Sequence, residues 1–479
     1  MTEAHPTRQA ARRAAGPQTP RGRALRVLLQ LERDVTPATV LLERLQHETP
    51  LSRPDASLAA AIVLGVLRRR LTLAHLARTC STADWSRVSR SLRAVMEIGL
   101  LQLCEMDRIP PFAAVSEAVN QAKAVGGRKA AGLVNAVLRE FLRRRGARRS
   151  RPEDLDERRW LPAGADGGFV LNAPIWPDPT ARQVEFISLT TSHPAWVVRR
   201  WLDRFGPDDC RRICEMGIRR PPLVLRPNRA RIDAPALSGL LRTDGFDALR
   251  DDPTGAVQIA GAVSIRELAV FEKGLCQPQD LASQSVLLLR PPVPGEFVLD
   301  LCAGAGTKAT HAAELLSDRG VVLASDRDAR RLAQLRENAA RLGLTCIRCV
   351  PPARLPAALN EVGRPPDLLL VDAPCSNSGV FARRPEARYR LGAAELARLS
   401  GVQDGLLDRA ADFSGPGTAL VYSTCSLEPE ENEQVVQRFC IRRPNWRLET
   451  SRLTLPDPGG EGRLWRDGGF VARLSWAAR

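Results

Sequence analysis

From residue 297 onward, the sequence alternates between short apolar runs and longer amphipathic runs. The apolar runs, which predict β-strands, span 297–301, 320–326, 345–350, 367–374 and 418–425. The amphipathic runs, which predict helices, span 308–317, 328–342, 394–413 and 430–440. A closing strand is expected near 469–474. Repeated strand–helix units of this kind predict a parallel, doubly wound α/β sheet of the Rossmann-like type.

The first of these units contains a turn of small residues, VLDLCAGAGTKATH at 298–311. Small residues let the backbone approach a ligand closely, and the following helix start offers unpaired N–H groups. Asp326 ends the next strand, about 20 residues on, where nucleoside-binding sheets hold ribose hydroxyls. Lys308 is one of only four lysines in a chain with 70 Lys+Arg, which favours a specific need for a compact ammonium. A purely structural turn is the alternative interpretation.

Two later strands end in cysteines. Asp372 and Cys375 follow the apolar run 368–371, and Cys425 follows the apolar run 419–422. Ligands of an open α/β sheet bind at the carboxyl ends of its strands, near the point where strand order reverses. If these are the fourth and fifth strands, both thiols lie beside the small-residue turn of the first.

A thiol at such a site indicates chemistry on a pyrimidine. Carbon 5 of a pyrimidine is not nucleophilic, but a thiolate that adds at carbon 6 converts the ring into an enamine. Carbon 5 can then attack an electrophilic methyl group, provided that the cysteine is partly exposed and activated. An acid group near ring N3 is also required, and Asp372 is the candidate.

The remaining cysteines are interpreted as buried thiols, with no metal site expected. Cys346 and Cys349 share one predicted strand, and their odd spacing directs them to opposite faces. Cys210 and Cys214 could share a helix face, but no second ligand pair lies near them in the sequence. Histidine, with five residues in the chain, is too scarce to complete a zinc site.

The region before residue 276 divides into four expected segments. Residues 1–20 predict a disordered basic tail, and 21–145 an all-α domain. Residues 146–185 predict a linker, and 186–275 a small α+β subdomain, followed by the catalytic domain at 276–479. The basic run 143–151, RRRGARRSR, is either a solvated linker or an arm that contacts phosphates.

The net charge of +16 and a pI near 10.2 favour a polyanionic partner, nucleic acid first. Codon bias from a GC-rich genome explains arginine in place of lysine, but it does not explain the excess of base over acid. No uninterrupted apolar stretch is long enough to span a bilayer, and the N-terminus has no apolar signal-peptide core. Eleven cysteines in such a chain favour reduced thiols, so a cytoplasmic location is expected.

Several motifs resemble those of the Sun-type RNA (cytosine-5) methyltransferases, which use S-adenosylmethionine. Upstream segments resemble the small RNA-binding subdomain and the NusB-like helical domain found in bacterial small-subunit rRNA methyltransferases of this family. The motifs are DLCAGAGTK, SDRDARRL, VDAPCSNSGV, YSTCSLEPEENE and DGGFVARL, preceded by HPAWVVRRWLDRFG, RRPPLVLRPN and GLVNAVLREFLRR.

The resemblance implies roles for individual residues. Cys425 would be the nucleophile, Cys375 would assist product release, and Asp372 would hydrogen-bond the target cytosine. Asp326 would hold the ribose hydroxyls of the cofactor. The loop that would cradle the cofactor consists of Cys302, Ala303, Gly304, Ala305, Gly306, Thr307 and Lys308.

Two positions depart from the family pattern. Thr307 stands where glycine is usual, which requires a compatible φ angle, and Pro352 stands where the family has an aspartate near the adenine. The resemblance favours small-subunit rRNA as the substrate of a monomeric enzyme. The alternatives are the same chemistry on tRNA, or a NusB-like RNA-binding scaffold whose methyltransferase half is inactive.

Overall fold

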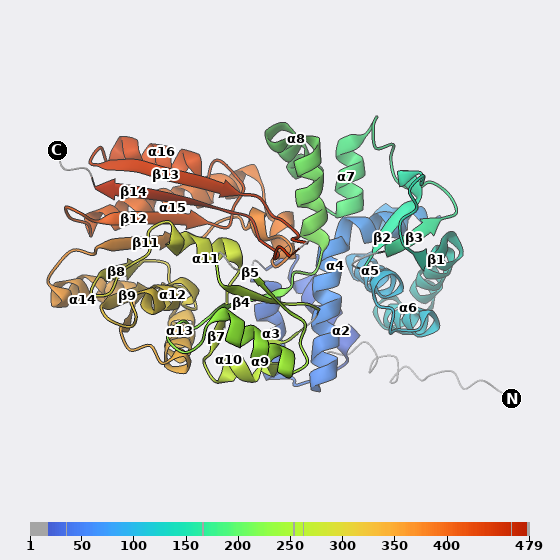
Figure 1. Ribbon diagram of the computed structural model, residues 1–479. Helices are drawn as coiled ribbons and strands as arrows, with labels where there is room; N and C mark the ends of the chain where they lie inside the picture. The colour runs from blue at the N-terminus through green and yellow to red at the C-terminus, as the bar shows by residue number, and fades with distance from the viewer. Residues whose placement is uncertain are drawn as a thin grey trace. The chain divides into compact units, whose positions relative to one another are not determined.

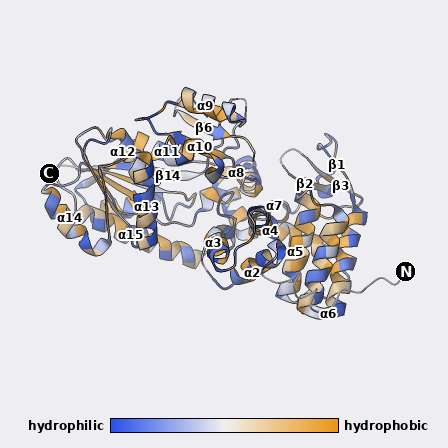
Figure 2. Cartoon of the chain, turned by 90° about the horizontal axis from the view of Figure 1, so that it is seen from below, coloured by the Kyte–Doolittle hydropathy of each residue, from blue (hydrophilic) through white to orange (hydrophobic). Residues whose placement is uncertain are grey.

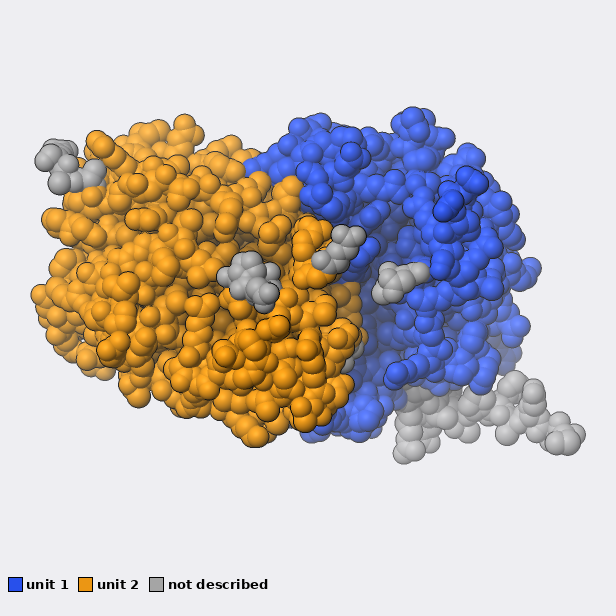
Figure 3. Space-filling view, viewed as in Figure 1, with its two compact units in different colours: residues 1–219, 384–389 blue, residues 220–383, 390–479 orange. Residues whose placement is uncertain are grey.

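The computed structural model describes residues 18–34, 36–164, 167–251, 254–261, 263–460 and 462–476. The expected basic tail therefore lies outside the described residues, apart from its last three positions. The chain forms two compact units (Figure 3). Unit 1 comprises 1–219 and 384–389, and unit 2 comprises 220–383 and 390–479. No helix in the described part of the chain is long and apolar enough to cross a membrane.

The described part of unit 1 begins with five helices, as the expected all-α domain requires. Their starts are well specified: Thr19, Ser52 and Ser89 each accept a backbone N–H at a helix N-cap. Hydrophobic and hydrophilic residues alternate along α5 and α6, so each helix can bury one face (Figure 2). The helices are α2 (Pro20–Gln30), α3 (Ala38–Glu48), α4 (Arg53–Thr79), α5 (Arg90–Glu105) and α6 (Pro111–Arg144).

A small antiparallel sheet lies in the range where the sequence predicted a linker. Its strands are β1 (Arg145–Arg149), β2 (Trp160–Ala163) and β3 (Gly167–Leu171), in the order β1-β3-β2. The linker prediction was wrong for these residues. Arginines, glycines and a proline occupy half of the strand positions, so the expected apolar alternation is absent. Trp160 and Phe169 are nevertheless buried in the folded protein, and this burial of apolar surface stabilises the sheet.

Two further helices complete unit 1, α7 (Gln183–Thr191) and α8 (Ala195–Ile218). The boundary between the units therefore falls inside the range 186–275 expected for the α+β subdomain. Residues 384–389 also belong to unit 1, although in the sequence they lie between a strand that ends at residue 372 and a helix that begins at residue 393, both in unit 2. Within unit 1, the buried Arg388 of this segment donates to the carbonyl oxygen of Gly217 at 2.5 Å.

Unit 2 contains a small four-stranded antiparallel sheet with the order β5-β6-β4-β7. Apart from β7, this sheet and the helices beside it lie in the range where the sequence predicted a small α+β subdomain. The elements are β4 (Leu223–Pro227), α9 (Ala234–Thr243), β5 (Ala248–Asp251), β6 (Ala256–Ile259), α10 (Ala269–Glu272) and β7 (Cys276–Pro278).

The main sheet of unit 2 has seven strands in the order β10-β9-β8-β11-β12-β14-β13 (Figure 1). The first five pair in parallel, and β14 and β13 are antiparallel. The closing strand is confirmed as β14, whereas β13 is an edge strand that the sequence analysis missed. The strands are β8 (Phe297–Asp300), β9 (Val321–Ser325), β10 (Ile347–Val350), β11 (Leu368–Asp372), β12 (Ala419–Thr424), β13 (Trp446–Thr454) and β14 (Gly469–Trp476).

Helices cover both faces of this sheet, which confirms the doubly wound fold. Alternate residues of each central strand enter opposite cores: Leu299 packs with α14, α15 and α16, and Val298 packs with α11, α12 and α13. The helices are α11 (Leu281–Leu288), α12 (Thr307–Leu315), α13 (Ala329–Leu342), α14 (Leu355–Val362), α15 (Ala393–Asp412) and α16 (Glu433–Arg442). Short 3₁₀ turns occupy 85–87, 157–159, 265–267, 352–354, 378–380 and 385–389.

Candidate active site

Every residue predicted for the site lies at the carboxyl edge of β8, β9, β11 or β12, in the loop that follows, or in the first turn of α12. β8 and β11 are neighbours in the sheet, and β11 pairs in turn with β12, with Asp372 opposite Ser423. These are the first, fourth and fifth strands of the main sheet in chain order. The expectation that both cysteine loops lie beside the small-residue loop is met directly for Cys375, whereas the Cys425 loop lies one strand further along the edge, next to the Cys375 loop.

The loop between β8 and α12 adopts a conformation that requires glycine. Gly304 and Gly306 have φ angles of 55° and 88°. A Cβ at Gly306 would lie 1.9 Å from Cδ1 of Leu335, so a larger residue would strain the backbone and displace that side chain. A Cβ at Gly304 would meet no atom within 4 Å, which leaves open space over the loop backbone. Thr307, the departure from the family pattern, is the first residue of α12 and has no positive φ, so its branched side chain is accommodated.

Asp326 joins the end of β9 to this loop. One carboxylate oxygen accepts the Gly304 N–H at 2.9 Å, and the other accepts the Asp328 N–H at 2.8 Å. Each carboxylate oxygen has a second lone pair, so the group can still accept from a ligand. Asp326 therefore shapes the loop as well as presenting an acceptor beside it.

Lys308 and Asp372 form an ion pair across the sheet edge. The Lys308 Nζ lies 2.6 Å from Oδ2 of Asp372, and only 11% of the lysine side chain is exposed. The hydroxyl of Ser423 donates to the other oxygen of Asp372 at 2.7 Å. A compact ammonium fits this narrow position, which agrees with the choice of lysine in an arginine-rich chain. Asp372 is thus oriented from two sides.

The two thiols are in direct contact. Sγ of Cys375 and Sγ of Cys425 are 3.1 Å apart, and both residues are partly exposed. The Cys425 thiol also lies 3.3 Å from Oδ1 of Asn377, whose αL backbone (φ 62°) turns the loop after Cys375 back toward β12. The hydrogen bond with Cys425 and burial raise the pKa of the Cys375 thiol well above its usual value. Cys375 therefore keeps its proton in this arrangement.

A buried carboxylate that the sequence analysis did not identify ties the two cysteine loops together. Glu431 is fully buried and accepts from the backbone N–H and hydroxyl of Ser376, and from the hydroxyl of Ser426. Gln403 adds a fourth hydrogen bond at 3.1 Å. Ser376 follows Cys375, and Ser426 follows Cys425, so Glu431 fixes the position of both thiols. The signal in the sequence was the acidic run EPEEN directly after the second cysteine motif.

The residues at this edge fit S-adenosylmethionine. Oδ2 of Asp300, at the end of β8, is buried and has no hydrogen-bond partner among the described residues. Burial raises the pKa of this carboxyl to about 7. An unpartnered buried carboxylate beside a glycine loop suits the α-ammonium group of the cofactor, and Asp326 suits its ribose. Cys302 packs its side chain against the apolar core and can offer only backbone groups.

The cysteines outside the site were expected to be buried thiols and not metal ligands. In the described ranges, no group of three or more His, Cys, Asp or Glu residues is arranged to hold an ion. Cys346 and Cys349 lie on or next to β10, and Cys210 and Cys214 lie on α8. Burial raises the pKa of Cys346 to about 12, so it remains a neutral thiol.

Three family models match successive parts of the chain. Residues 18–143 match the NusB family, and residues 193–266 match the ferredoxin-like domain of RsmF/B-like methyltransferases. Residues 286–462 match the model described as 16S rRNA methyltransferase RsmB/F, and this range contains all the site residues described above. The order of the three models agrees with the order inferred from the motifs.

Similar proteins cover nearly the whole chain. A probable ribosomal RNA small subunit methyltransferase B from Synechocystis is 32% identical over 90% of this chain and 91% of its own length. The Bacillus subtilis protein of that name is 29% identical over 89% of each chain. The crystal structure of NSun6 from Pyrococcus horikoshii with SFG has the same fold, with a TM-score of 0.51 and 22% identity over 60% of this chain and 99% of that one. The chain therefore belongs to the S-adenosylmethionine-dependent family of ribosomal RNA small subunit methyltransferase B.

Proposed function

We propose that this protein transfers a methyl group from S-adenosylmethionine to carbon 5 of a cytosine in 16S rRNA, through a covalent bond between Cys425 and carbon 6. The observation that carries the proposal is the contact between the two thiols at 3.1 Å, at the edge that also holds the glycine loop. A cysteine pair at the ends of adjacent strands can attack a base and later release it.

Cys425 is the better nucleophile of the two. Cys375, whose pKa is raised, keeps its proton and can donate a hydrogen bond to the Cys425 sulfur once Cys425 has lost its own proton to solvent. Such a donor stabilises the thiolate without neutralising it. The thiolate then attacks carbon 6 of the cytosine and forms a carbon–sulfur bond.

Asp372 and Lys308 act on the opposite side of the ring. Attack at carbon 6 moves electron density toward N3, and a hydrogen bond or proton delivered there stabilises the adduct. Asp372, held by Lys308 and Ser423, is the group that the edge offers for this role, and the proton that it passes to N3 comes from the Lys308 ammonium paired with it. Bound S-adenosylmethionine supplies the electrophilic methyl group, which carbon 5 attacks.

Release requires loss of the carbon 5 proton and cleavage of the bond to Cys425. The main cause of the raised pKa of Cys375 is its hydrogen bond with Cys425. Once the Cys425 sulfur is bonded to carbon 6, this cause is weakened, and the pKa of Cys375 falls. Cys375 then gives up its own proton to solvent and, as a thiolate, takes the carbon 5 proton, while the carbon 6–sulfur bond breaks and Cys425 leaves as a thiolate.

Single substitutions of the two cysteines test these roles. The Cys425→Ala protein should neither methylate nor form an adduct. The Cys375→Ala protein should attack and methylate but release slowly, and should accumulate a denaturant-stable complex that requires S-adenosylmethionine and Cys425. A denaturing gel with labelled 16S rRNA fragments measures the adduct, and Cys440→Ala, a cysteine of α16 away from the edge, is the control. An adduct in Cys425→Ala would overturn the assignment.

The finer parts of the proposal concern partners and location. The names of the relatives support small-subunit rRNA over tRNA as the substrate. We propose that the protein acts as a monomer in the cytoplasm and needs no metal, because cysteine, aspartate and lysine supply the chemistry. Bisulfite mapping of rRNA and tRNA from cells with and without the gene identifies the methylated nucleotide. If cells without the gene lose a methylated cytosine in tRNA alone, tRNA replaces 16S rRNA as the proposed substrate.

A further inference from the structure

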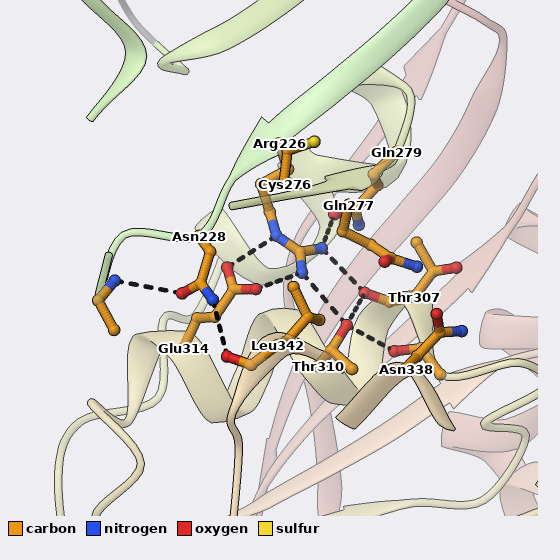
Figure 4. A network of polar contacts seen from close by, with 12 residues as sticks. Arg226, Asn228, Cys276, Gln277, Gln279, Thr307, Thr310, Glu314, Asn338 and Leu342 are labelled. Carbon is orange, nitrogen blue, oxygen red and sulfur yellow. Dashed lines mark hydrogen bonds and ion pairs between the residues drawn. The ribbon is translucent and has the colours of Figure 1, made fainter. Parts of the chain in front are cut away.

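An arginine of the four-stranded antiparallel sheet of unit 2 reaches α12, the helix that starts at the glycine loop. Arg226 lies on β4, and its side chain is 2% exposed. The guanidinium group has five N–H donors, and each has an acceptor (Figure 4). Two donors pair with Glu314 at 2.7 and 2.9 Å, and the other three reach Thr310 Oγ1, the carbonyl oxygen of Thr307 and the side chain of Gln279.

Three of the residues that Arg226 contacts lie along one face of α12. Thr307, Thr310 and Glu314 are spaced at helical intervals, and Thr307 is the first residue of the helix. The contact with the Thr307 carbonyl at 3.0 Å therefore fixes the first turn. The same turn carries Lys308, and Gly306 is its N-cap. The direction of the helix start sets where the loop N–H groups and the lysine point.

Stability alone is a weak reason for this arrangement. The Glu314 side chain is 1% exposed, and burial raises the pKa of its carboxyl despite the arginine beside it. Replacing a buried ion pair with apolar residues of similar size is often neutral or stabilising, because the desolvation of both charges is avoided. A fully satisfied fork does, however, specify one geometry for the groups that it joins.

We propose that Arg226, paired with Glu314, is a positioning residue that holds the start of α12 in the geometry required for S-adenosylmethionine binding. The inference rests on the proposed function for the location of the cofactor. It assigns the four-stranded antiparallel sheet of unit 2 a part in building the cofactor site, in addition to any contact with RNA. Arg226 itself does not touch the reacting atoms.

The decisive variant removes both charges together. In Arg226→Met/Glu314→Met, flexible apolar side chains fill the space and no unpaired charge remains. We expect the full-length protein to fold and to bind a 16S rRNA fragment with unchanged affinity. Its Kd for S-adenosylmethionine, measured by calorimetry, should rise at least tenfold. The KM for S-adenosylmethionine should rise in parallel, with kcat at saturating cofactor within about twofold of the wild-type value.

Asn228→Ala is the matched control. Asn228 is also buried and lies just after β4, but its amide donates to the carbonyl oxygens of Gly274 and Leu342, at the end of α13. This substitution should lower the Tm while the Kd for S-adenosylmethionine stays unchanged. An equal rise in Kd in this control would mean that any loosening of the small sheet weakens the site, and would overturn a specific role for Arg226.

Two further outcomes are distinguishable. Wild-type cofactor affinity in the folded double variant overturns the inference but leaves the proposed function intact. Failure of the wild-type protein to bind S-adenosylmethionine overturns the proposed function itself. If the double variant does not fold, Arg226→Lys decides, because it keeps the charge near Glu314 but loses the fork. An unchanged Kd in the folded Arg226→Lys protein overturns the inference.

Discussion

At the carboxyl edge of the main sheet, the surroundings of reactive side chains raise their pKa values. Cys375 and Cys425 are 3.1 Å apart, and the hydrogen bond between them and burial raise the pKa of Cys375, so this thiol keeps its proton. Asp300 lies at the end of the neighbouring strand β8, and its burial raises its pKa to about 7. Function at this edge thus depends on which groups are charged near neutral pH.

Asp300 provides a test through pH. Its carboxyl ionises near pH 4 in the unfolded chain and near pH 7 in the folded one, so the folded protein binds more protons between these values. Its contribution to the free energy of unfolding therefore falls as pH rises from about 4 to about 7, and the loss is complete above that. We predict that the free energy of unfolding of Asp300→Asn, measured by urea denaturation, exceeds that of the wild type by about 2–4 kcal/mol at pH 8. The difference should be much smaller at pH 4.5.

Cofactor binding should change in the opposite sense. If Asp300 pairs with the ammonium group of S-adenosylmethionine, binding favours the ionised carboxylate, and wild-type affinity should increase from pH 6 to pH 8. The affinity of Asp300→Asn should be lower and nearly independent of pH over that range. Calorimetry at three pH values checks this, and parallel pH profiles in the two proteins would remove Asp300 from the cofactor site.

At the scale of elements, the site is held by contacts between loops. The loop after β11 and the loop after β12 carry one thiol each, and Glu431 connects them through three hydrogen bonds, with a fourth from Gln403 of α15. The loop after β8 is braced by Asp326 from β9 and by Asn338 of α13, which donates to the Ala305 carbonyl at 3.0 Å. Each reactive loop is therefore positioned by a polar group from another element.

Glu431→Gln should uncouple the two thiol loops. An amide offers one acceptor oxygen and two N–H donors, so it cannot accept all four hydrogen bonds and leaves buried donors unpaired. We predict a loss of about 1–3 kcal/mol in the free energy of unfolding. We also predict at least a tenfold loss of kcat, with the KM for S-adenosylmethionine unchanged. Glu433→Gln, the same change at an exposed position of α16, is the control; equal activity in the two variants would argue against the positioning role.

The molecule as a whole carries a charge of +16, but not every basic residue is available to a partner. In the run that begins at Arg143, Arg145 stacks over Phe169 and donates to the Leu103 carbonyl, and Arg148 pairs with Asp107 and donates to the Ala163 carbonyl. Arg143 is 75% exposed. The run is thus part of a sheet, and only some of its arginines are positioned as a phosphate-contacting arm would require.

Salt dependence distinguishes the two kinds of arginine. Each phosphate contact that is lost should lower the slope of log affinity against log salt by just under one unit. We predict that Arg143→Gln/Arg149→Gln lowers the slope for 16S rRNA fragments by about one to two units without a change in Tm. Arg148→Gln should instead lower the Tm and leave the slope nearly unchanged. Identical slopes in all proteins would mean that the arm does not contact RNA.

Much of the fold was predictable because its signals are local. The apolar run 297–301, the glycine turn and the start of α12 all lie within one short stretch, and each follows from side-chain size and periodicity. The parallel order of the central strands followed from the same alternation. Asp372, Cys375 and Cys425 could be identified because parallel strands bring their carboxyl ends to one edge, whatever the details of the loops.

Other features depended on contacts between residues far apart in the chain. The strand β13 has mostly exposed side chains, so no apolar alternation marks it, and only its pairing with β14 makes it a strand. Arg226 and Glu314 are 88 positions apart. Glu431 looked like one acid among several, until the fold buried it between two loops. The sequence by itself determined the central strands and helices of the main sheet and the reactive groups, since those depend on neighbouring residues. The strands β1–β3 and β13, burial and hydrogen-bond partners belong to the tertiary structure, because only folding removes a polar group from water and forces it to find a partner.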